Sequence, residues 1–186
     1  MTYNVEKYLK PIPSSLLKEC TYLVDSTKAF KTKFLVEKAK FNPEKHELLF
    51  LDIKSLYPSV NVNRTLSLIL ELLFANPKKY FPDEFDSEGT RLPKPSRVNF
   101  LKLMKYTLTK FSIFRTRIGV FRQLDGLSME SCLSGIKFNL FVHMLEKSVI
   151  EKFENSGDII SWIRYADDVC FIVKNGSFDK VLKKNR

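Results

Sequence analysis

The sequence is poor in the residues that build disulfide frameworks and zinc sites. Its 186 residues include three cysteines, Cys20, Cys132 and Cys170, and two histidines, His46 and His143. The cysteines are far apart and form no CxxC pair, and neither histidine lies near them at ligand spacing. We therefore expect reduced thiols in or near a core, rather than a disulfide scaffold or a zinc site.

Long apolar runs, repeats and low-complexity tracts are also missing. No stretch approaches the ~20 apolar residues that cross a bilayer, and the first ten residues lack the pattern of a secretory signal. We therefore expect an intracellular protein, in the nucleus or cytoplasm, with no membrane partner. The length fits one domain, or one domain and part of another, and 44% hydrophobic residues suffice for a core.

Acidic residues are scarce relative to basic ones. Lys and Arg number 31 against 21 Asp and Glu, which gives a net charge of +10. This balance favours an anionic partner, although a basic soluble surface would produce the same total. The basic residues gather in two stretches, one with Lys28, Lys31, Lys33, Lys38 and Lys40, and one with Lys105, Lys110, Arg115, Arg117 and Arg122.

Hydrophobic spacing predicts an α+β layer fold with an antiparallel sheet backed by helices. The clearest helix is 63–74, where Leu66, Ile69, Leu70 and Leu73 recur at helical spacing. The remaining predictions are helices over 14–40, 99–111 and 131–153, the last with a stripe of Phe141, Met144, Leu145 and Val149; a buried strand over 48–51; hairpins over 112–123 and 159–173; and a surface loop over 76–97.

Three carboxylates stand at the ends of predicted strands. Asp167 and Asp168 occupy the turn of the apolar 159–173 hairpin, and Asp52 follows the 48–51 strand. An exposed polar turn would explain the pair by itself. Three acids on two strand ends instead suit a pair of Mg²⁺ ions, which prefer carboxylate oxygen and water. Two such ions about 4 Å apart activate a hydroxyl and stabilise the leaving group in phosphoryl transfer.

The segments around these acids resemble the three catalytic motifs of reverse transcriptases. The first reads FLDIKSLYPSV at 50–60, the second QLDGLSMESCLS at 123–134, and the third RYADD at 164–168. The sequence at 125–129, together with Leu145-Glu146, is similar to Penelope-like retroelements in particular. The resemblance extends over residues 25–173.

This resemblance implies an RNA-directed DNA polymerase that adds deoxynucleotides to a primer 3′-hydroxyl by two-metal catalysis. Asp52, Asp167 and Asp168 would be the catalytic acids. Together with the backbone carbonyl of Ile53, they would hold two Mg²⁺ (or Mn²⁺) ions. The expected partners are an RNA or DNA template with its primer, and deoxynucleoside triphosphates.

The resemblance also implies roles outside the acids. Tyr57 would lie under the incoming sugar and exclude a 2′-hydroxyl. Gln123 and Gly126 would line the nucleotide and template pocket, because glycine permits close backbone approach. Weaker candidates for contacts to nucleic acid are Lys28, Lys31, Lys33, Arg115, Arg117 and Arg122.

The implied organisation is a single reverse transcriptase domain fragment over 1–186. Residues 1–45 would be partial fingers, and 46–186 the palm, with an inserted fingers segment at 76–122. A thumb and a nuclease domain are absent from the sequence, which suggests a fragment of a longer product or a decayed copy. The second motif departs from the family at Glu130, where glycine is usual, and at Cys132, where proline or serine is usual. Glu130 is expected to repel phosphates.

Three alternatives stay open. A catalytically inactive nucleic-acid-binding remnant would explain Glu130 and the missing thumb. A viral RNA-directed RNA polymerase typically has a second aspartate five residues after the first and Gly-Asp-Asp in the third motif, whereas this sequence has Tyr57 and Ala166. A basic structural protein with no site would not explain three motifs in order.

Overall fold

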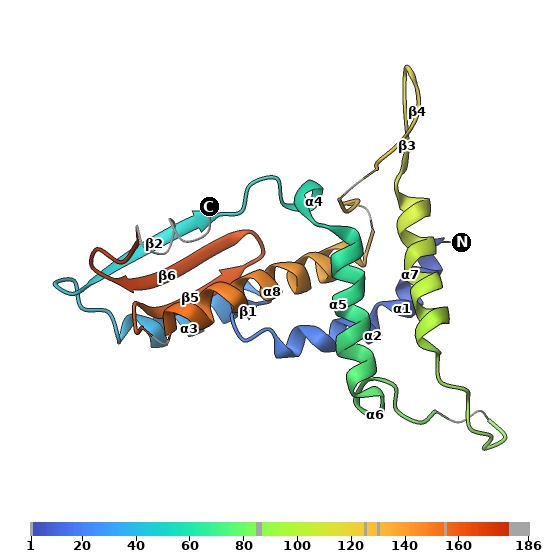
Figure 1. Cartoon of the computed structure of the whole chain (residues 1–186), viewed down its shortest axis with the longest axis horizontal. Helices are drawn as coiled ribbons and strands as arrows, with labels where there is room; N and C mark the ends of the chain where they lie inside the picture. The colour runs from blue at the N-terminus through green and yellow to red at the C-terminus, as the bar shows by residue number, and fades with distance from the viewer. Residues whose placement is uncertain (1, 85–86, 125, 130, 155, 179–186) are drawn as a thin grey trace. The chain divides into compact units, whose positions relative to one another are not determined.

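A computed structural model describes residues 2–84, 87–124, 126–129, 131–154 and 156–178 of the chain (Figure 1). The chain forms two compact units. The helical unit contains the residues up to Glu19 together with Tyr57–Phe141. The sheet unit contains Cys20–Leu56 and the chain from Val142 onwards.

The sheet unit is built on a four-stranded mixed sheet with the order β1-β5-β6-β2. Its strands are β1 (Leu23–Val24), β2 (His46–Asp52), β5 (Ile159–Tyr165) and β6 (Asp168–Lys174). Strands β2, β6 and β5 pair antiparallel as predicted, but β1 pairs parallel with β5. The prediction of a purely antiparallel sheet is therefore wrong. A two-residue strand is too short to show a hydrophobic period, and its partner lies about 140 residues further along the chain.

The core of the sheet unit lies between the sheet and the end of helix α8 (Ser134–Glu154). A cluster of five buried side chains fills it: Phe153, Ile159, Val169, Phe171 and Val173. Helix α3 (Thr27–Lys38) packs on β5 and begins at Ser26, whose side chain accepts a hydrogen bond from the Ala29 amide at 3.2 Å. Burying each large apolar side chain stabilises the unit by about 1.5–3 kcal/mol. This packing holds the two central strands, β5 and β6, in place.

Strand β2 is present as predicted, but it is not buried. It is an edge strand paired only with β6 in the described sheet. Phe50 is 66% exposed and Leu51 36% exposed. The prediction rested on an apolar run, and such a run indicates a strand without indicating what covers its faces.

The helical unit is organised around α5 and α7. Its elements are α1 (Thr2–Leu9), α2 (Pro11–Ser14), η1 (Ser15–Glu19), α4 (Leu56–Ser59), α5 (Val62–Ala75), α6 (Pro77–Tyr80), α7 (Arg97–Phe111), β3 (Ile113–Thr116) and β4 (Gly119–Arg122). Helix α5 packs on α7, and so does α1. The four apolar residues that predicted α5 are all buried, and Asn61 caps its first turn at the Arg64 amide. The predicted hairpin at 112–123 is also confirmed as β3–β4.

Three other predictions hold only in part. The 14–40 segment is mostly helical as predicted, but a turn and the short strand β1 separate η1 from α3. The 76–97 loop opens with the single helical turn α6, which Pro77 begins. Helix α8 forms over nearly the predicted span, but Leu145 in its predicted stripe is 40% exposed, whereas Leu140 and Ile150 are buried. The buried face also carries the charged residues Lys137 and Glu146, which a search for apolar spacing passes over.

None of the helices in the described residues is both long and apolar enough to span a membrane.

Candidate functional site

The sheet unit brings two of the three acids directly opposite each other. Asp52 ends β2 and pairs in register with Asp168, which begins β6. Directly opposite residues point their side chains to the same face, with Cα atoms roughly 4.5–5.5 Å apart. The Ile53 amide donates a hydrogen bond to the Asp167 carbonyl at 3.0 Å, which ties the end of β2 to the turn. Asp52, Asp167 and Asp168 are all exposed.

Asp167 lies in the two-residue turn between β5 and β6. Tyr165 pairs with Asp168, so Ala166 and Asp167 form the loop. Ala166 has φ of 51°, a conformation that favours glycine. Positive φ at the first loop residue is typical of a type II′ hairpin turn, and a residue with a Cβ adopts it at a cost of roughly 1–2 kcal/mol. The surrounding structure must therefore hold this turn in place.

A buried ion pair contacts the backbone of that turn. Arg164, which is 0% exposed, donates from Nε to Oε1 of Glu146 at 2.8 Å and from Nη1 to the Ala166 carbonyl at 3.0 Å. The Trp162 indole donates to the same Glu146 oxygen at 2.9 Å. One guanidinium thus links helix α8 to the backbone of the acid-bearing turn. Sequence reasoning missed this role, although a charged pair within an apolar strand and helix was a signal for it.

The topology also brings α3 to the acid-bearing end of the sheet. Strand β1 runs parallel to β5, with Val24 opposite Tyr165, so the chain leaves β1 beside the turn and enters α3 three residues later. Lys28 and Lys31 on this helix are exposed. Lys33 differs, because its ammonium donates to the Thr21 carbonyl at 2.6 Å and partial burial lowers its pKa. Of the three predicted lysines, Lys28 and Lys31 are therefore the better candidates for phosphate contacts.

The acids offer only oxygen donors, as Mg²⁺ and Mn²⁺ sites require. Within the described ranges, however, no three His, Cys, Asp or Glu side chains are grouped closely enough to hold a metal ion. The structure thus pairs Asp52 with Asp168 and places Asp167 on the adjoining turn, without drawing the three carboxylates together. Like charges directly opposite on paired strands are destabilising, so a cation between them would relieve repulsion.

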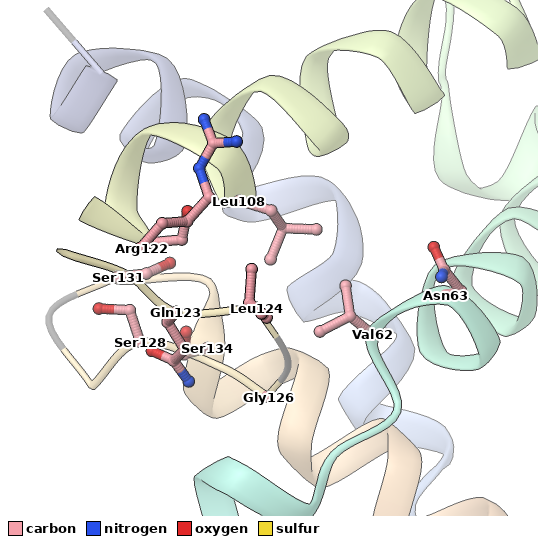
Figure 2. A pocket seen from close by; sticks show the side chains of 11 residues that line it. Val62, Asn63, Leu108, Arg122, Gln123, Leu124, Gly126, Ser128, Ser131 and Ser134 are labelled. Atoms are coloured by element: carbon pink, nitrogen blue, oxygen red, sulfur yellow. The ribbon is translucent and has the colours of Figure 1, made fainter.

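The helical unit contains a separate cavity of about 350 Å³ (Figure 2). Gln123 and Gly126 line it together, as does Arg122. Four serines add polar groups to its wall: Ser112, Ser128, Ser131 and Ser134. Ser134 is fully buried, and its hydroxyl has no hydrogen-bond partner among the described residues. The volume falls in the range of about 300–1,000 Å³ that small-molecule sites occupy.

The backbone around Gly126, within the helical unit, leaves no room for a side chain at this position. Its φ is +77°, and a Cβ built on it would lie 2.7 Å from the Tyr57 carbonyl oxygen and from the Pro58 Cα. The next amide, that of Leu127, donates to the same Tyr57 carbonyl at 2.9 Å. The sequence predicted close backbone approach at this glycine, and the approach observed is to residues 57 and 58 of the chain itself.

Tyr57 belongs to the helical unit and is half-buried. Its ring lies 6.0 Å from that of Phe138, between ring centroids. Together with its backbone contacts to the loop after Gly126, this fixes Tyr57 against the second motif. Its part in sugar selection stays a prediction.

The loop of the second motif is held by an N-terminal residue that the sequence did not indicate. Glu6 of α1 is 0% exposed and accepts hydrogen bonds from the Ser131 hydroxyl at 2.5 Å and the Cys132 amide at 3.0 Å. Nearby Lys137 is 1% exposed, and its ammonium has no hydrogen-bond partner in the described part of the chain. Burial lowers the pKa of Lys137 to about 8, although the negative charge of Glu6 acts to raise it. Glu130, whose effect was predicted above, lies outside the described residues.

The chain has the fold of a region of telomerase. Apo telomerase from Candida tropicalis, truncated from its C-terminal domain, matches with a TM-score of 0.68 and 16% identity over 97% of this chain. The apo C. tropicalis enzyme matches with a TM-score of 0.67 and 16% identity over 100% of this chain. Telomerase from C. albicans, in complex with a TWJ fragment of telomeric RNA, matches with a TM-score of 0.61 and 12% identity over 99% of this chain. The chain spans about a third of these proteins, between 31% and 36% of their length.

No family profile and no curated protein matches the sequence. The likeness to telomerase at these identities concerns the fold alone. It supports the expected fold of helices and a sheet, while the assignments to reverse transcriptases and to Penelope-like elements stay predictions.

Proposed function

We propose that the chain is the palm and partial fingers of an RNA-directed DNA polymerase, which adds deoxynucleotides to a primer 3′-hydroxyl on an RNA or DNA template. The observation that carries the proposal is the pairing of Asp52 with Asp168 beside the strained turn that bears Asp167, on a fold shared with telomerase, an RNA-templated DNA polymerase. The three motifs at 50–60, 123–134 and 164–168 further favour a Penelope-like retroelement as the source.

In this proposal each group at the acid-bearing end has a defined part. Asp52, Asp167, Asp168 and the Ile53 carbonyl would hold two Mg²⁺ (or Mn²⁺) ions, which would supply the positive charge that activates a primer hydroxyl and stabilises a leaving pyrophosphate. Lys28 and Lys31, at the first turns of α3, contact the triphosphate. The buried Arg164–Glu146 pair holds the turn in place. This positioning matters, because a displacement of about 1 Å at a catalytic group lowers the rate roughly a hundredfold.

The groups of the helical unit select the substrate. Tyr57 blocks the ribose 2′-hydroxyl, so that deoxynucleotides are preferred. The cavity with Gln123, Gly126 and Arg122 takes the nucleotide and the template base, and its serines supply neutral donors. The proposed domain limits are those of the sequence prediction, with fingers over 1–45 and 76–122 and palm elsewhere.

Primer extension tests the proposal. A labelled DNA primer on an RNA template would be incubated with the chain, deoxynucleoside triphosphates and either Mg²⁺ or Mn²⁺. We expect template-directed extension that Asp167→Asn abolishes and Glu151→Gln leaves unchanged, since Glu151 is an exposed acid of the same unit. Binding of the primer–template without any extension in either metal would overturn the proposal in favour of an inactive nucleic-acid-binding remnant.

A further inference from the structure

The β3–β4 hairpin of the helical unit has two faces of different chemistry. On one face Phe114 stands opposite Phe121, with ring centroids 5.8 Å apart and planes inclined by 22°. On the other face Ile113 pairs with Arg122 and Arg115 with Val120. Figure 1 shows the hairpin extending beyond the end of α7, within the same unit. It therefore presents an aromatic side and a basic side.

The apolar side chains of this hairpin are unusually open to solvent. Phe114 is 51% exposed and Phe121 41%, and Ile118 at the tip is 88% exposed. Phe114, Phe121 and Ile118 line one shallow depression together with Thr116 and Arg117. A two-stranded ribbon cannot bury both of its faces by itself, and a grouped exposed apolar surface commonly marks a binding site.

Charge indicates which partner fits. The segment Ser112–Gln123 contains three arginines, Arg115, Arg117 and Arg122, and no aspartate or glutamate. All three arginines are exposed. Arg117 lines the same depression as the two rings, while Arg115 and Arg122 lie on the opposite face of the narrow ribbon. An aromatic face with arginines at its tip and behind it suits a polyanion whose bases offer flat faces. In a duplex those faces are already stacked on one another, whereas a single strand leaves them open.

We infer that the β3–β4 hairpin binds single-stranded nucleic acid, with bases stacked on the Phe114–Phe121 face, a phosphate held by Arg117 at the tip, and further phosphates held by Arg115 and Arg122 where the strand passes to the opposite face. The inference rests on the proposed function for its context, since it identifies the unpaired template as the ligand. It concerns binding alone, so it stands or falls separately from catalysis.

Fluorescence anisotropy of the whole chain with a labelled 12-nucleotide RNA, and with a blunt duplex of equal length, tests the inference. We expect Phe114→Ala to weaken binding of the single strand roughly tenfold and to leave duplex binding nearly unchanged. The matched control is Tyr3→Ala, an exposed aromatic of the same unit. Because Phe114 is exposed, thermal melting by circular dichroism should show an intact fold in the variant.

Salt dependence tests the basic side. Arg115→Gln with Arg117→Gln should reduce the slope of log affinity against log salt by roughly 1.4, at about 0.7 for each lost phosphate contact. The control Lys102→Gln, at an exposed position of α7, should leave the slope within error. Equal losses for single strand and duplex would overturn base stacking. Self-association by sedimentation that Phe114→Ala abolishes, with RNA affinity intact, would show instead that the hairpin is a protein interface.

Discussion

Lys137 provides a prediction whose size follows from the structure. Its side chain is 1% exposed and its ammonium lacks a hydrogen-bond partner among the described residues. Burial lowers its pKa from 10.5 to about 8, while Glu6 and Cys132 act in the opposite direction. At ~1.4 kcal/mol for each pH unit, the charged lysine destabilises the folded state by about 3 kcal/mol at neutral pH.

The pH dependence has a definite sign. The folded pKa lies below the unfolded one, so the folded state binds fewer protons between about pH 8 and 10.5. The penalty is fully present below pH 8 and is relieved as the pH rises through this window. Lys137→Met removes the charge at similar length, so it should be more stable than the wild type at pH 7, with the advantage fading by pH 10.

Urea denaturation followed by circular dichroism at pH 7, 8, 9 and 10 measures this difference. The comparison of variant with wild type cancels the titrating groups that do not interact with Lys137. The control Lys147→Met removes an exposed lysine of the same helix and should change stability by less than about 0.5 kcal/mol at every pH. A Lys137→Met protein less stable than wild type at pH 7 would refute the reasoning.

Three further predictions concern the turn, the second motif and sugar choice. Glu146→Gln leaves the buried Arg164 charge uncompensated and should lower the free energy of unfolding by roughly 3 kcal/mol, whereas exposed Glu151→Gln should not. Gly126→Ala forces a Cβ to 2.7 Å from residues 57 and 58 and should cost roughly 1–3 kcal/mol, while Gly135→Ala, which meets open space, should be neutral or stabilising in the same melts. Tyr57→Val should raise ribonucleotide relative to deoxynucleotide incorporation in primer extension, with Tyr3→Val as control; an unchanged ratio would make Tyr57 only a packing residue.

Local patterns predicted much of the fold. The 63–74 helix, the 112–123 hairpin and the strand–turn–strand at 159–173 each follow from spacing or turn residues within a short window. The placement of Asp52 at a strand end and of Asp167 in a turn follows from the same patterns. The register that places Asp52 opposite Asp168 did not follow from them, because register between distant segments depends on the whole sheet.

The features that the sequence did not predict depend on long-range contacts. Glu6 holds the loop at Ser131 across 125 positions of sequence, and no local pattern indicates that an acid near the N-terminus is buried. The parallel strand β1 is too short to show a period. The charged residues of α8, Lys137 and Glu146, lie on its buried face, so apolar spacing alone assigned that face wrongly.

The central claim is that Asp52, Asp167 and Asp168 form a divalent-cation site. Paramagnetic broadening by Mn²⁺ in the amide spectrum of the ¹⁵N-labelled chain tests it without requiring catalysis. We predict that substoichiometric Mn²⁺ first broadens the amides at 52–53 and 166–169, and that Asp52→Asn with Asp168→Asn abolishes this effect. Broadening centred on other acids, or unchanged in the double variant, would contradict the account.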